Sequence, residues 1–460
     1  MNDWIDAESH VEKAHQLYED GRWDEAESEL REALSLNPYR AEWHFNLGLT
    51  LEAAGRFEQA VRAFTDCQNL ENEDPHVMLC LGVNLLRCDR PGEAIPWLEK
   101  AEKADPGSAM PFVHRIQAYA RLGDHEQAEV MFYMAQQINP KDAQAFVNLA
   151  DSLLDRGLHE KAVWCLREAA NLDPAMPGIH ARLAEAYAAT GRAERARQLY
   201  LRELRNNPGD INTLLDLGCL LTDMNRPQEA GEKFRRVLEM ESDNPDAHYH
   251  LADLAERQGQ SDSALEQFNV VLRLDAAFPG VRRRIAALLL TRKRPQALAE
   301  AREHLASELA ETESHADRYR PIDLADLGRT LLDAGMYTEA RRLLANLSER
   351  CPEDPHTQHL FSVAQFQLGE RAEGIETCRR VLRIDPKFVP AMHNVAVAYV
   401  YERQWSKARY WVRQALLVDP DDAALRRLRL KLRLHTVAEA LGLVFGPLFS
   451  AFTRRRPAMR

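Results

Sequence analysis

The sequence holds few cysteines, and none of them is paired. Seven cysteines are scattered along 460 residues without a C-x-x-C motif. Nothing therefore indicates a disulfide framework or a dithiol redox site. The chain opens with MNDWIDAESHVEKAHQL, which is acidic and has no apolar stretch. We expect no signal peptide, reduced thiols and a cytoplasmic location.

Long apolar runs and catalytic motifs are also missing. No apolar stretch reaches the roughly 18–20 residues that span a bilayer. The sequence has no phosphate-binding glycine loop and no nucleophile elbow. His248, His250 and Asp253 could suggest a metal site, as could His356 and His359, but no further ligands follow at a known spacing. We expect no metal, no cofactor and no enzymatic activity.

Positive charge is scarce outside the last part of the chain. The sequence contains 59 basic and 71 acidic residues, which gives a net charge of −12. Residues 423–460 hold nine Lys or Arg and one Glu, so the remainder has 50 basic and 70 acidic residues. This excess of negative charge repels phosphate backbones. We expect no binding to nucleic acid.

Small residues recur with a period of 34. When windows of 34 residues are counted from Ala7, position 8 is a small residue in eleven of twelve windows, and position 20 is alanine in ten. Residues 1–312 hold nine windows in phase. The segment ESHADRYR, residues 313–320, shifts the frame by eight residues before three more windows fill residues 321–422. We expect 313–320 to be a polar connection or a hinge.

Each window has the pattern of two helices joined by a tight turn. Leu47 and Leu51 lie on one face of a first helix, and Ala60 and Phe64 are four residues apart on a second helix. Glycine at position 15 suits the turn, and proline at position 32 ends the second helix. The glycines are Gly21, Gly55, Gly123, Gly157, Gly191, Gly259, Gly335 and Gly369; the prolines are Pro38, Pro106, Pro140, Pro174, Pro208, Pro352, Pro386 and Pro420.

Small side chains at positions 8 and 20 allow the two helices of a window to pack closely, with Leu, Tyr or Phe around them. That packing offsets the cost of about 0.5–1 kcal/mol for a glycine inside a helix. Because a 34-residue hairpin cannot bury its apolar face alone, successive hairpins must stack. The sequence therefore predicts an all-α solenoid.

The small residues at positions 8 and 20 and the proline at position 32 resemble the tetratricopeptide repeat family over residues 7–422. The resemblance implies a right-handed superhelical α-solenoid of about twelve 34-residue helix-turn-helix repeats, whose first helices line an inner groove. Such repeats usually bind an extended or helical segment of another protein. The departures are Ile116 at position 8, Gln365 at an apolar position, and a ninth window with Leu298 at position 20 and a longer second helix.

The groove positions that the resemblance assigns carry many carboxylates in the middle windows. Acidic side chains along one concave surface focus a negative potential, which suits a basic peptide. The same residues could be the solvated face of an acidic chain, with Arg182 and Arg257 weakening the field. Both interpretations stay open. The candidate residues are Asp151, Asp155, Glu185, Asp216, Asp223 and Asp253.

Asparagine occupies position 6 in three windows, as Asn46, Asn148 and Asn394. In sugar-transferring enzymes that carry these repeats, an asparagine ladder at this position holds a peptide backbone. The ladder is incomplete here, so the three amides either make single contacts to a partner or are polar residues on a wet helix face. The carboxylate clamp of heat-shock-chaperone adaptors matches only at Asn46.

Residues 423–460 break the repeat. Leu425, Leu428 and Leu432 form a stripe that suits a basic capping helix over the last repeat. The apolar stretch 437–452 has Glu439 as its only charge and is too short to span a bilayer. It could lie at a membrane surface, attach to a partner or a second copy, or fold back over the array. The candidate attachment residues are Leu441, Phe445, Leu448, Phe449 and Phe452.

These observations favour a non-enzymatic interaction scaffold or adaptor. The concave groove would bind a protein or peptide segment, with a basic segment best suited to the carboxylates. The tail would be a second attachment site, through which the chain could also self-associate. The alternative is a peripheral membrane-associated assembly factor held at the bilayer by residues 436–460.

Overall fold

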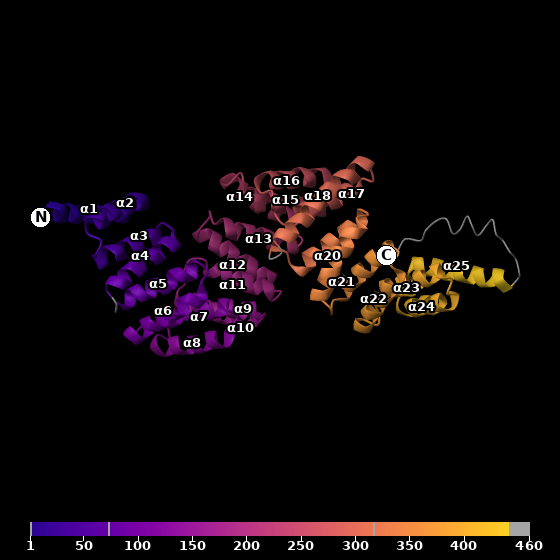
Figure 1. The fold of residues 1–460 in the computed structure, drawn as a ribbon, viewed down its shortest axis with the longest axis horizontal. Coiled ribbons are helices and arrows are strands. Elements are labelled where there is room, and N and C mark those ends of the chain that lie inside the picture. The colour runs from indigo at the N-terminus through magenta and orange to yellow at the C-terminus, as the bar shows by residue number, and fades with distance from the viewer. Residues whose placement is uncertain (1, 72–73, 316–317, 441–460) are drawn as a thin grey trace. The chain divides into compact units, whose positions relative to one another are not determined.

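The computed structural model describes residues 2–71, 74–315 and 318–440 (Figure 1). In these ranges the chain forms 25 α-helices and no strand. The all-α solenoid predicted from the period is confirmed. Two compact units follow one another along the sequence, Met1–Arg236 and Val237–Arg460.

The first unit contains α1 (Asn2–Glu19), α2 (Trp23–Leu36), α3 (Ala41–Ala53), α4 (Phe57–Leu70), α5 (Pro75–Arg87), α6 (Pro91–Ala104), α7 (Met110–Arg121), α8 (His125–Ile138), α9 (Ala143–Asp155), α10 (His159–Leu172), α11 (Ile179–Ala189), α12 (Ala193–Asn206) and α13 (Ile211–Asp223). The boundary falls within α14 (Pro227–Met240). The second unit contains α15 (Pro245–Arg257), α16 (Ser261–Leu274), α17 (Val281–Thr291), α18 (Pro295–Ser314), α19 (Pro321–Asp333), α20 (Tyr337–Arg350), α21 (Pro355–Gln367), α22 (Arg371–Ile384), α23 (Val389–Tyr401), α24 (Trp405–Val418) and α25 (Ala423–Ala440).

Up to α24, the odd-numbered helices are the first helices of the predicted windows and the even-numbered helices are the second. The two helices of a window pack against each other, as α3 does with α4 and α15 with α16. Second helices also contact the first helix of the next window, as α4 does with α5. This nearest-neighbour packing is what a stacked hairpin needs in order to bury its second apolar face.

Position 8 of the first helix lies against position 24 of the second. A Cβ atom added to Gly48 would lie 2.5 Å from Cε1 of Phe64, which is closer than real side chains approach. Gly218 and Phe234 repeat this arrangement, and both phenylalanine side chains are fully buried. The close packing expected at position 8 is confirmed, because the absence of a side chain makes room for an aromatic ring.

Position 15 adopts a left-handed backbone conformation in every window. The eight predicted glycines have φ between 68° and 84°. The other four windows place Asp89, Asn225, Lys293 and Arg403 there, with φ of 56°, 58°, 50° and 59°. These four are the non-glycine residues with positive φ in the described part of the chain. The turn therefore keeps one geometry even where its residue is not glycine.

Proline at position 32 follows the end of the second helix, as predicted. Helix α8 ends at Ile138, and Pro140 comes two residues later. Asp142 then caps α9, since its carboxylate accepts a hydrogen bond from the backbone N–H of Ala145 at 3.0 Å. Chain reversal and the start of the next repeat thus take only four residues.

The frame shift at 313–320 follows an unusually long second helix. Helix α18 has 20 residues, as expected for the ninth window. Its Glu308 is 1% exposed and accepts a hydrogen bond from the backbone N–H of Gly280 at 2.8 Å. Tyr319, in the connection itself, is buried against Leu324 and Leu347. The apolar core continues from α18 into α19, so packing spans the shift; a hinge there stays a prediction.

The last described helix, α25, packs on the final repeat. Leu425, Leu428 and Leu432 are 0%, 7% and 3% exposed and join the core formed by α23 and α24. The candidate attachment residues from Leu441 to Phe452 lie outside the described residues. Among the described helices, none is long and apolar enough to cross a membrane.

Candidate partner-binding groove

The first helices form the inner side of the stack in the first unit. Successive first helices contact each other, as α5 does with α7, α7 with α9, and α11 with α13. The second helices instead contact the next first helix, as α10 does with α11. Most of the predicted groove carboxylates lie on three of these first helices, α9, α11 and α13.

Asp151 is paired across the repeat boundary. Nη1 of Arg182 on α11 lies 2.7 Å and 2.8 Å from the two carboxylate oxygens of Asp151 on α9. Arg182 is at position 6 of its window, and Asp151 is at position 9 of the window before it. Burial raises the pKa of Asp151, while the charge of Arg182 acts in the opposite direction. This carboxylate is therefore partly neutralised by the chain itself.

The second unit repeats this pair at the same two positions. Nη2 of Arg284, at position 6, lies 2.6 Å from Asp253, at position 9 of the preceding window. Arg257 also reaches Asp253 at 2.7 Å. The Asp253 side chain is only 15% exposed. Asp253, predicted to face a partner, is committed to two arginines within its own unit.

Glu185 and Asp216 occupy the same two positions one window after Asp151 and Arg182. Asp216 of α13 is at position 6, and Glu185 of α11 is at position 9 of the window before it. Both side chains are exposed. Where the other two repeats place an arginine beside a carboxylate, this one places two carboxylates. Among the described residues, no cation pairs with Glu185 or Asp216 as Arg182 and Arg284 pair with Asp151 and Asp253.

The electrostatics of this carboxylate pair follow from its surroundings. Desolvation by the neighbouring helices raises the pKa of Asp216 to about 6, and the charges of Glu185 and Asp210 act in the same direction. Tyr200 of α12 is 3% exposed. Burial and the charges of Asp216 and Glu185 raise the pKa of Tyr200, so its phenol stays neutral. A cation placed between Glu185 and Asp216 would relieve their repulsion.

The remaining acidic candidates lie at the ends of their helices. Asp155 closes α9 and Asp223 closes α13, and both are exposed. The charge of Asp155 contributes to the raised pKa of Asp151. These two residues extend the negative surface along the C-terminal ends of the first helices.

Two of the three asparagines differ from the expectation of a wet helix face. Asn148 is 5% exposed, and its amide donates a hydrogen bond to the carbonyl oxygen of Val113 at 2.8 Å. Asn394 is fully buried, while Asn46 is partly exposed. Asn148 and Asn394 are therefore packing residues between helices, because their burial removes them from a surface that a partner can touch.

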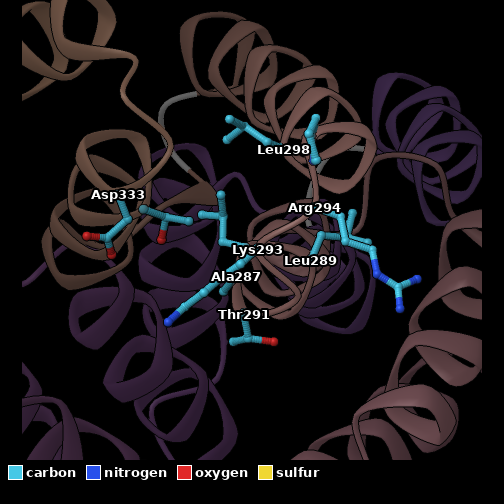
Figure 2. A pocket seen from close by; sticks show the side chains of 10 residues that line it. Ala287, Leu289, Thr291, Lys293, Arg294, Leu298 and Asp333 are labelled. Carbon is cyan, nitrogen blue, oxygen red and sulfur yellow. The ribbon is translucent and has the colours of Figure 1, made fainter.

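A cavity of about 620 Å³ lies beside the frame shift in the second unit (Figure 2). Leu289 and Leu290 of α17, Leu298 of α18 and Asp333 of α19 line it. Leu298 stands at position 20, where ten of the twelve windows have alanine. Figure 2 shows Leu298 and Asp333 on different sides of the opening. The sequence predicted irregular packing in this window but not a cavity.

The histidines considered as metal ligands are not assembled into a site. In the described ranges, no group of three or more His, Cys, Asp or Glu side chains is placed to hold a metal ion. Nδ1 of His248 instead lies 2.8 Å from Oε1 of Gln267.

Family models decide which family the chain belongs to. A model described as the tetratricopeptide repeat matches residues 11–67, 147–211, 215–280 and 325–387, and a second model of that description matches 110–132. Together these matches cover more than half of the sequence. The chain is a tetratricopeptide repeat protein. Tetratricopeptide repeats bind protein partners, which makes this protein an interaction scaffold.

The tetratricopeptide repeat protein is similar to parts of several curated proteins. It is 24% identical over 273 residues to human protein O-mannosyl-transferase TMTC3, which covers 52% of this chain and 30% of the relative. It is 24% identical over 222 residues to rat DnaJ homolog subfamily C member 3, with 46% and 44% covered. The chain spans less than half the length of these relatives.

Two solved structures are similar to this chain. A tetratricopeptide repeat protein from Parabacteroides merdae is 17% identical, with a TM-score of 0.45, over 51% of this chain and 93% of that one. The Cut9–Hcn1 hetero-tetramer of the APC/C is 14% identical, with a TM-score of 0.43, over 91% of this chain and 95% of that one.

Proposed function

We propose that this tetratricopeptide repeat protein is a non-enzymatic scaffold that binds a basic segment of a partner protein on the inner surface of α9, α11 and α13. The supporting observation is the Glu185–Asp216 pair. In register with it, Asp151 has Arg182 and Asp253 has Arg284, whereas in the described part of the chain no arginine or lysine pairs with Glu185 or Asp216. A lysine or arginine of the partner takes the place of the missing internal cation.

The other groove carboxylates support this assignment to different degrees. Asp155 and Asp223 are exposed and extend the negative surface, so they attract a basic segment at long range. Asp151 and Asp253 already hold arginines and contribute less. Asn46 is partly exposed and can hold one backbone amide of an extended segment.

A peptide selection tests the proposal. The full chain is immobilised and exposed to a random peptide library, and the same selection is run on Asp216→Arg and Asp66→Arg variants. Asp216→Arg places beside Glu185 the cation that the flanking repeats already have. Asp66 lies exposed on the second helix α4, so its variant changes the net charge equally away from the groove.

Peptides enriched in lysine and arginine are expected on the unsubstituted chain and on Asp66→Arg. Their affinity for Asp216→Arg should fall by about tenfold or more, because a repulsive pair replaces an attractive one. Equal enrichment on all three proteins, or selection of peptides without basic residues, would refute the groove assignment.

The role of the tail stays a prediction from the sequence. Attachment through Leu441, Phe445, Leu448, Phe449 or Phe452, to a partner, a second copy or a membrane surface, concerns residues outside the described ranges. Comparing the selected peptides' affinity for the full chain and for a 1–440 truncation tests whether the tail competes for the groove. An unchanged affinity removes the option in which the tail folds back over it.

A further inference from the structure

The outer side of the first unit holds a cavity lined by arginines. It has a volume of about 640 Å³ and lies between the second helices α10 and α12, above the start of α11. Arg167 comes from α10, and Arg195, Arg202 and Arg205 come from α12. Among the described residues that line it, none is acidic. Four cations around one hollow make a strong local positive field in an acidic chain.

His180 lies buried in the wall of this cavity. His180 is 4% exposed, and neither of its ring nitrogens has a hydrogen-bond partner. Burial and the nearby charge of Arg202 lower the pKa of His180. The adjacent Glu203 is occupied, since its Oε1 accepts a hydrogen bond from the backbone N–H of Gly178 at 3.1 Å. A buried imidazole whose two nitrogens form no hydrogen bond lowers the stability of the fold, unless a ligand supplies a hydrogen-bond partner.

Three of the four cavity arginines, Arg167, Arg202 and Arg205, form no ion pair in the described part of the chain, and Arg195 packs over the ring of Tyr187. Elsewhere in this unit, Arg192 pairs with Glu160 at 2.8 Å and Arg226 lies 3.7 Å from Glu194, both across repeat boundaries. In the part of the chain that the structure describes, no carboxylate pairs with Arg167, Arg202 or Arg205.

A second hollow continues the arginine-lined cavity along α10. It shares Arg167 and Arg195 and adds Trp164, Arg192 and the carboxylates Glu160 and Glu194 to its lining. Trp164 is 53% exposed, which is unusual for so large an apolar ring. The arginine-lined cavity offers cations for a negatively charged group, and Trp164 in the second hollow offers an aromatic surface for an apolar neighbour.

We propose that the arginine-lined cavity binds an acidic side chain, carrying either a carboxylate or a phosphoryl group, on an extended segment of a partner protein. The acidic group lies between Arg167 and Arg202 and accepts a hydrogen bond from a ring nitrogen of His180. An apolar residue beside it in the segment packs on Trp164. This site is separate from the groove: it lies on the outer helices and selects the opposite charge.

Charge complementarity is the reason for choosing an acidic occupant. The chain carries a net charge of −12 and repels acidic peptides over most of its surface. Only a local cluster of unpaired arginines overcomes that repulsion. Guanidinium groups also match carboxylate and phosphoryl oxygens in geometry, because each presents a fork of N–H donors.

Three labelled peptides of equal length test the proposal on the full chain. One carries a Glu-Glu-Phe core in a Gly-Ser background, one replaces the first Glu with phosphoserine, and one has Gln-Gln-Phe. Binding is measured by fluorescence anisotropy at low and physiological salt. We expect one or both acidic peptides to bind, more weakly at higher salt, and the Gln peptide not to bind. Binding of the phosphoserine peptide alone assigns a phosphoryl group, and competition by inorganic phosphate shows that the ion suffices.

Paired charge reversals locate the binding. The Arg167→Glu, Arg202→Glu double variant changes exposed side chains and should weaken the acidic peptides by about tenfold or more. The matched control is Arg62→Glu with Arg235→Glu, two exposed arginines on α4 and α14 that do not line the cavity. Equal weakening by both double variants, or none by the first, overturns the proposal.

The signals of the buried His180 distinguish a peptide bound in the cavity from one attracted to the protein surface. The imidazole signals of His180 in an NMR spectrum, assigned with a His180→Asn variant, should shift when the Glu peptide is added and stay unchanged with the Gln peptide. Acidic peptide binding without a shift at His180 places the peptide on the outer arginines only and refutes the cavity as its site.

Discussion

The inner contact of each repeat depends on how little side chain the first helix carries at position 8. Gly48 lies so close to Phe64 that no Cβ atom fits between them, and Gly218 and Phe234 share that arrangement. Ala252 with Phe268 shows that an alanine is accepted when the ring is placed to suit it. A larger residue at this position has no space to enter.

Gly218→Val should therefore destabilise the first unit by about 2 kcal/mol, because the valine side chain overlaps the ring of Phe234. The free energy of unfolding in denaturant measures the effect. Gly92→Val is the control, since a Cβ atom there meets open space, and its stability should change by less than about 0.5 kcal/mol. Equal losses for both variants would mean that backbone effects and not packing set the cost.

Substitutions of the turn residue at position 15 should lower stability at one site and raise it at another. Gly55→Ala should cost about 1 kcal/mol, purely from the backbone, because φ is 74° and no atom lies within 4 Å of the new Cβ. Arg403→Gly should stabilise the second unit by about 0.5–1 kcal/mol by removing the same strain. Thermal unfolding checks both, and a stabilising Gly55→Ala would contradict the left-handed turn.

Asp216 makes stability and binding depend on pH. With its pKa raised to about 6, the folded chain binds more protons than the unfolded chain between about pH 4 and pH 6. The free energy of unfolding therefore falls as pH rises through this range, and the penalty is complete above it. Because the carboxylate is exposed, screening reduces the penalty to about 1 kcal/mol.

Asp216→Asn should remove this penalty. We expect the variant to exceed the unsubstituted chain by about 1 kcal/mol at pH 7 and to match it near pH 3.5. Asp66→Asn, which alters an exposed carboxylate on α4, should leave the difference between the two pH values unchanged. A pH-independent gain in Asp216→Asn would show that the ionisation of Asp216 is not its cause.

Residue identity predicted some contacts and not others. Positions 8 and 15 were predictable because packing and turn geometry depend on one residue type within one repeat. The burial of Asn148 and the pairing of Asp151 were not, because both depend on how far one repeat is rotated against the next. The pairing of Asp151 did have a signal in the sequence, which is an arginine at position 6 one window after an aspartate at position 9.

Helices at the end of the stack need a cover, and α25 provides it for the last described repeat. Leu425→Ala should lower the stability of that repeat by about 2–4 kcal/mol, because Leu425 is fully buried in the core of α23 and α24. Leu430 lies on the same helix but is 59% exposed, so Leu430→Ala should cost less than about 0.5 kcal/mol. Hydrogen exchange along α23 and α24 measures the difference, and unchanged protection in Leu425→Ala would contradict capping.

Ion pairs between the residue before a second helix and the preceding second helix are a regular feature of the first unit. Arg56 reaches Asp24, Arg90 reaches Glu58, and Arg192 reaches Glu160, each from position 16 to position 18 of the preceding repeat. Such exposed pairs contribute about 0–1 kcal/mol each. They fix the register of neighbouring repeats more than they stabilise the fold, and a single-repeat view of the sequence does not reveal them.

Across the whole molecule, the repeat period predicted the fold class, the helices and their turns. It did not predict where the chain divides into compact units, which is within α14. The windows on either side of α14 keep their phase, so the pattern there has no break. In a solenoid each repeat contacts only its neighbours, and any of these interfaces can be a boundary.

The central claim is that a basic segment binds between Glu185 and Asp216. Its most direct test is hydrogen exchange of the full chain with and without a lysine-bearing peptide from the selection. We predict slower exchange in α11 and α13, and no such change in the Asp216→Arg variant. Protection confined to α10 and α12, or to α25, would contradict the groove assignment.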